Sequence, residues 1–244
     1  MRCSHAKVAA TLFGLVTLTA AQGTQVGAPD FSVAGSVAWI AQGGDFIAPE
    51  SGPRPVTYDP VHPFVAGAIP DPYIADSSDT RRPSQFTWRV ADLSNPILQP
   101  WAREELSKRR DRILAGGTGY NRQVACWPVG VPAFLLGAVD PVFFIQTPDK
   151  VVMIWQNDHQ VRHIYLNVPH SANPKPSWYG ESIGRYEGDT LVVDTIGLNT
   201  KTFVDNYRTP HTFQLHTVER FRMIEAGRML EVNVHVEDRG AFTT

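Results

Sequence analysis

The stretch Leu230-Glu-Val-Asn-Val-His-Val236 alternates strictly between apolar and polar side chains. A period of two is typical of a β-strand with one covered face and one face toward solvent. Further β-rich runs precede this stretch and are separated by turn residues such as Gly188-Asp189, which favour a two-residue hairpin. The sequence therefore predicts strands at 141–146, 151–156, 161–167, 182–187, 190–196, 213–224 and 230–236.

Strands joined mostly by short turns predict an antiparallel up-and-down meander. Closing such a meander removes its exposed edges, so we expect a mainly β, barrel-like (calycin-like) domain. No alternation of strands with helices indicates a parallel sheet. One helix is expected before the strands, at 97–115, because its apolar residues follow a helical stripe and Pro100 suits a first turn.

The N-terminus has the order of a secretory signal peptide. Arg2 and Lys7 precede an uncharged apolar run, and Thr19-Ala20-Ala21 offers small residues for cleavage. The run is shorter than the roughly 20 residues that a membrane-spanning helix needs. We expect residues 1–21 to be removed, the mature protein to be secreted or periplasmic, and no membrane span to remain.

Residues 22–96 form a segment rich in proline and glycine, which cannot build long helices or central strands. We expect it to wrap around a domain at 97–244 and to contain short strands near 36–42 and 85–90. Beyond the signal, Cys126 is the one cysteine, so no intrachain disulfide is expected. A lone cysteine is more typical of a small buried side chain than of a nucleophile.

Two short motifs suggest chemistry that their context does not favour. Gly180-Glu-Ser-Ile-Gly184 matches the serine-hydrolase pattern G-x-S-x-G, but a β-hairpin follows it where a hydrolase has a helix. His159 and His163 have the H-x-x-x-H spacing, but four residues of strand span about 13 Å, too far for one metal ion. We therefore interpret the first motif as a strand entry and predict no metal site.

A dispersed set of polar residues on the predicted strands is a better candidate for a site. Asp194 shares a face with Val192 and Ile196, so we expect it to need a partner such as Arg185, Arg220 or a histidine. A histidine beside a carboxylate can perform acid–base chemistry. The predicted catalytic residues are His163, Asp194, His216 and Glu219, and the predicted substrate-binding residues are Tyr165, Trp178, Arg185 and Arg220.

Four stretches of the second half have a recognisable pattern: Ile145-Gln-Thr-Pro-Asp-Lys-Val-Val-Met-Ile, Arg162-His-Ile-Tyr, Gly180-Glu-Ser-Ile-Gly-Arg-Tyr-Glu-Gly-Asp-Thr-Leu-Val-Val-Asp-Thr and Leu215-His-Thr-Val-Glu-Arg-Phe-Arg. They resemble a large family of uncharacterised exported bacterial proteins. The resemblance covers roughly residues 120–244 and implies a bacterial, here Gram-negative, origin and export. It implies no activity. The meander is also similar to lipocalins, by analogy of fold alone.

Two functions are therefore expected. The first is a cofactor-free lyase, isomerase or hydrolase acting on a small, partly apolar molecule. The second is a non-catalytic binding or carrier protein with the same barrel. The charges are scattered and sum to −2, which argues against nucleic acid as the partner. A third interpretation is an envelope-associated protein that uses the proline-rich segment as an arm. The sequence predicts no oligomeric state.

Overall fold

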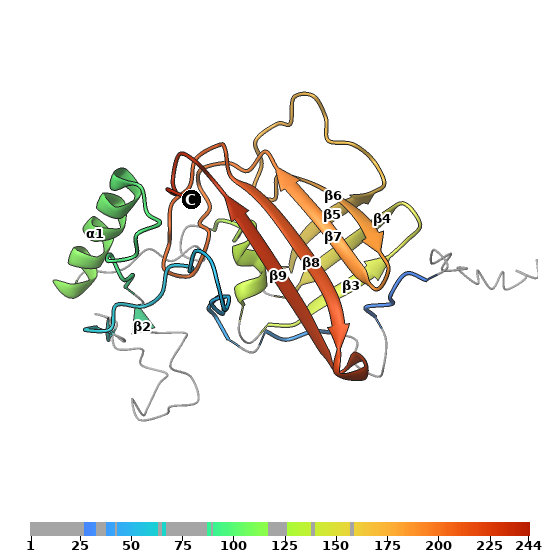
Figure 1. The fold of residues 1–244 in the computed structure, drawn as a ribbon, viewed down its shortest axis with the longest axis horizontal. Helices are drawn as coiled ribbons and strands as arrows, with labels where there is room; N and C mark the ends of the chain where they lie inside the picture. The colour runs from blue at the N-terminus through green and yellow to red at the C-terminus, as the bar shows by residue number, and fades with distance from the viewer. Residues whose placement is uncertain are drawn as a thin grey trace, which may run out of the picture.

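The computed structural model describes residues 27–32, 38–41, 43–62, 65–66, 87–88, 90–116, 126–137, 140–156 and 159–244 (Figure 1). The predicted signal peptide lies outside these residues. The elements are β1 (Val65–Ala66), β2 (Thr87–Trp88), α1 (Pro100–Leu114), η1 (Ala133–Leu136), β3 (Val142–Gln146), β4 (Lys150–Trp155), β5 (Gln160–Leu166), β6 (Glu181–Glu187), β7 (Thr190–Ile196), β8 (His216–Ile224), η3 (Glu225–Gly227) and β9 (Met229–Glu237).

Strands β3 to β9 form one seven-stranded sheet in sequential order. The prediction of a mainly β meander is confirmed. The prediction that it is antiparallel throughout is wrong at one place, because β5 and β6 pair in parallel. The connection at 167–180 is long enough to bring the chain back before β6 begins, whereas a two-residue hairpin forces antiparallel pairing. Such a hairpin joins β6 to β7 at Gly188, whose φ of 61° suits the turn.

The sheet curls into a half-barrel, with β3 and β9 at its two edges. One face, which we call the covered face, holds the apolar side chains that alternate along the strands. Phe134 of η1 and Phe31 of the N-terminal segment pack on this face. The core at the covered face includes Val151, Met153, Trp155, Ile164, Leu191, Val193 and Phe221, all fully buried.

A second core lies at one end of the sheet, where α1 packs (Figure 1). The helix buries Ala102 and Leu106 against the loop after β7 and the C-terminal residues Ala241 and Phe242. Pro100 occupies its first turn, as predicted. Lys108 Nζ lies 2.9 Å from Glu104, the ion pair that the i, i+4 spacing favours. No helix in the described part of the chain is long and apolar enough to cross a membrane.

The segment before the helix has little regular structure where it is described. β1 and β2 form a two-stranded antiparallel ladder, and β2 lies within the strand predicted at 85–90. The strand predicted at 36–42 lies partly outside the described residues. In its described part, Trp39 exchanges two backbone hydrogen bonds with Val142, 2.8 and 2.7 Å long, and so extends the β3 edge of the sheet.

Candidate functional site

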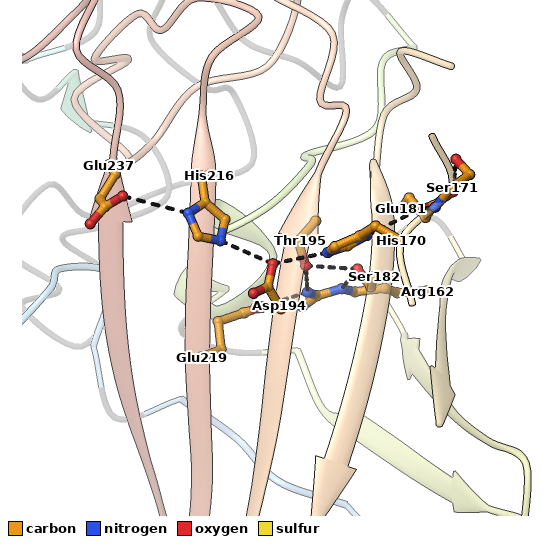
Figure 2. A network of polar contacts seen from close by, with 10 residues as sticks. All are labelled: Arg162, His170, Ser171, Glu181, Ser182, Asp194, Thr195, His216, Glu219 and Glu237. Atoms are coloured by element: carbon orange, nitrogen blue, oxygen red, sulfur yellow. Dashed lines mark hydrogen bonds and ion pairs between the residues drawn. The ribbon is translucent and has the colours of Figure 1, made fainter. Parts of the chain in front are cut away.

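Two connected groups of polar side chains lie on opposite faces of the sheet (Figure 2). The first group lies on the open face, opposite the covered one. It alternates carboxylate and imidazole across the strands, and we call it the polar row. Its members are Glu237 of β9, His216 of β8, Asp194 of β7, His170 of the loop before β6, and Glu181 of β6.

Asp194 is the centre of the polar row, because two histidines meet at one of its oxygens. His170 Nε2 lies 3.0 Å and His216 Nε2 lies 2.9 Å from Asp194 Oδ1. The three side chains are 20 to 32% exposed, so they are shielded but within reach of solvent. A carboxylate oxygen only accepts hydrogen bonds, so each Nε2 must supply a proton to make its bond.

The two histidines differ at their second ring nitrogen. His170 Nδ1 lies 3.0 Å from Glu181 Oε1, a second hydrogen bond to a carboxylate. With both carboxylates ionised, His170 satisfies both contacts only when both nitrogens carry a proton. His216 Nδ1 lies 3.6 Å from Glu237 Oε2, which is longer than a hydrogen bond. His216 Nδ1 is therefore the imidazole nitrogen of the row that can exchange a proton with a bound molecule.

The outer carboxylates of the polar row are held in their ionised form. Ser171 donates to Glu181 through its hydroxyl and its backbone N–H, each at 2.7 Å. These bonds hold the pKa of Glu181 below its ordinary value. The pKa of Glu237 is also lowered, mainly by His235 and to a smaller extent by His216.

The second group lies on the covered face and is fully buried. Arg162 of β5 donates from Nη1 to Glu219 Oε1 of β8 at 3.0 Å, and its Nη2 bonds the other carboxylate oxygen. Ser182 accepts from Arg162 Nε at 3.2 Å, and Thr195 accepts from Nη2 at 2.9 Å. The two hydroxyls also bond each other at 2.9 Å. Both charges are thus paired, as burial requires.

The structure therefore divides the predicted catalytic residues. It brings Asp194 and His216 into contact, and a histidine is one of the partners expected for Asp194. It places Glu219 on the opposite face, bonded to Arg162, so Glu219 and Asp194 cannot contact the same substrate. His163 lies on the open face of β5, where its ring stacks on Tyr165 with centroids 6.4 Å apart.

The predicted substrate-binding residues also separate. Arg185 and Arg220 both bind Glu187, each at 2.8 Å, on the open face. Trp178 lies in the loop after β5, with its ring centroid 5.6 Å from that of Trp127.

The G-x-S-x-G motif is structural here, as interpreted from the sequence. Ser182 is buried within the Arg162 network. Gly180 has φ +63°, and a Cβ there would lie 2.3 Å from the Ile196 carbonyl oxygen. Gly184 leaves room for Ile164 on the neighbouring strand.

Cys126, expected to be buried, is exposed. Among the described residues, no group of three or more histidine, cysteine and acidic side chains is arranged to hold a metal ion.

Sequence reasoning missed His170 and Arg162. His170 lies in a proline-rich connection without strand periodicity, and no local signal marks it. Arg162 could have been found, because it shares its strand parity with Ile164 and Leu166 and therefore faces the core. The same parity places Glu219 with Phe221 on β8.

No protein-family model, no curated protein and no solved structure matches the chain. The fold and site define a mainly β half-barrel protein with a histidine–carboxylate row on its open face.

Proposed function

We propose that the chain is an exported protein that binds a small, partly apolar molecule at the polar row and performs cofactor-free acid–base chemistry on it. The reaction class is that of a lyase, isomerase or hydrolase. The supporting observation is the single oxygen, Asp194 Oδ1, that fixes the Nε2 atoms of both His170 and His216. A carboxylate that holds one imidazole nitrogen orients the other toward a reacting group.

The two histidines would have different roles. His216 is hydrogen-bonded at Nε2 and makes only a longer, 3.6 Å contact with Glu237 at Nδ1, so it exchanges a proton with the bound molecule through Nδ1. His170, hydrogen-bonded to Glu181 and to Asp194, positions the Asp194 carboxylate. The alternative function is that of a non-catalytic carrier. Exposed apolar side chains on the open face of β3 and β5 favour it, namely Ile145, Val161 and Tyr165.

Ligand identification tests the proposal first. Native mass spectrometry of the protein purified from its own envelope fraction is expected to reveal a bound small molecule. Asp194→Asn and His216→Gln should then abolish turnover of that molecule, whereas His159→Asn should not. His159 is an exposed histidine outside the polar row with φ 51°, a conformation that asparagine tolerates. Binding without turnover in the wild type would support the carrier. If both the binding and the turnover of the ligand were unchanged in Asp194→Asn and in His216→Gln, the polar row would not be the binding site.

A further inference from the structure

Strand β9 is an edge of the sheet in the described part of the chain. All nine of its residues pair with β8, which is its only partner strand among the described residues. On its other side, no backbone hydrogen bond joins β9 to any other residue that the structure describes. The opposite edge differs, because Trp39 bonds to Val142 of β3. A long edge with unpaired N–H and C=O groups is a template for another strand.

The covered face is also incomplete at β9. On the inner strands this face is fully buried, as at Leu191 and Phe221. The apolar row continues onto β9, but its members there are only half-buried: Leu230, Val232, Val234 and Val236. A strand added beside β9 would cover them.

The sequence of β9 is complementary to itself. In an antiparallel pair of two β9 strands centred on Asn233, Glu231 of each copy faces His235 of the other, an acid against a base. Val232 faces Val234 on the covered face, and Leu230 faces Val236. Centring on Val234 instead would place Glu231 against Glu237, two like charges. The pattern therefore favours the register centred on Asn233 over the register centred on Val234.

We propose that two copies of this chain associate through β9, antiparallel and centred on Asn233, so that their sheets become continuous. The contact is isologous, because the same strand serves both copies about a two-fold axis. Glu231 keeps its contact with Arg222, 2.9 Å away on β8, and His235 keeps Glu237.

Cross-linking tests both the contact and its register. In a full-length chain with Cys3→Ser and Cys126→Ser, Asn233→Cys opposes its own copy, with Cβ atoms about 5 Å apart, and is expected to form a disulfide-linked dimer. Glu231→Cys and His235→Cys should each fail alone and cross-link when mixed. Arg220→Cys, exposed on β8 away from the edge, is the control.

The unmodified chain provides the second measurement. Sedimentation equilibrium is expected to show a dimer. Glu231→Lys should raise its dissociation constant at least tenfold, because the lysine faces His235 of the other copy. A monomer at all concentrations would overturn the proposal. A dimer in which Asn233→Cys cross-links no faster than Arg220→Cys would overturn it as well, because another surface would then form the contact.

Discussion

Arg162 on β5 and Glu219 on β8 form an ion pair, although β6 and β7 lie between their strands. In a flat sheet these strands would be about 14 Å apart and their side chains would be parallel. Arg162 extends beneath β6 and β7 toward Glu219, and Ser182 and Thr195 accept hydrogen bonds from its guanidinium on the way (Figure 2). The pair therefore connects strands three places apart on the face opposite the polar row.

Breaking this pair should be costly. Glu219→Leu leaves the Arg162 charge buried without a counterion, and we expect the free energy of unfolding to fall by about 3–5 kcal/mol. Urea unfolding measures it. The double variant Arg162→Met/Glu219→Leu removes both charges and should regain most of the loss. A double variant as unstable as the single one would show that the network stabilises through its hydroxyl bonds instead.

Thr217 offers a substitution that should stabilise. Its hydroxyl is fully buried and has no hydrogen-bond partner among the described residues. Thr217→Val removes that hydroxyl at nearly constant volume, so we expect a gain of about 1 kcal/mol in unfolding free energy. Thr195→Val is the matched control on the adjacent strand, because its hydroxyl accepts from Arg162 and its loss should destabilise. Destabilisation by Thr217→Val would indicate an ordered water at this hydroxyl.

Asp205, buried in the loop after β7, should make stability depend on pH. Burial raises its pKa from 3.8 to about 6, although Thr209 and Tyr207 donate to it. The Asp205 carboxyl therefore binds its proton more tightly in the folded state than in the unfolded chain. The stabilisation that this proton gives to the folded state is complete below about pH 4. It is lost as the pH rises through about 6, and the total loss is about 3 kcal/mol of unfolding free energy.

Asp205→Asn removes this titration. The unfolding free energy of the wild type, relative to that of Asp205→Asn, should fall between pH 4 and 8 in urea titrations. The comparison is relative because His211 in the same loop acts in the opposite direction. Burial lowers the pKa of His211. The contribution of His211 to the unfolding free energy is therefore lost as the pH falls below the pKa of an ordinary histidine. Parallel profiles for the two proteins would contradict the assignment to Asp205.

Glu181 should tether the loop that contains His170. Its carboxylate accepts the Ser171 backbone N–H at 2.7 Å, so Glu181→Ala is expected to speed hydrogen exchange of the Ser171 amide at least tenfold. Glu187→Ala is the control, because Glu187 also lies on β6 but binds Arg185 and Arg220. Equal exchange in the two variants would mean that another contact holds the loop.

Local patterns explain which parts of this structure could be predicted. The alternation in β9 and the Gly188 turn are encoded by adjacent residues, and both were found where expected. The direction of β6 relative to β5 depends on the path of a long loop, which no periodicity records. Asp194 and His216 were found because they are polar residues on strands. His170 was not, because its position depends on that same loop.

The polar row depends on the two longest connections between neighbouring strands of the sheet and not on its short hairpins. Residues 197–215 separate β7 from β8, and residues 167–180 separate β5 from β6. Asp194 meets His216 and His170 at sequence separations of 22 and 24. Closing loops of similar length costs similar entropy, so we expect neither histidine to reach Asp194 much before the other during folding.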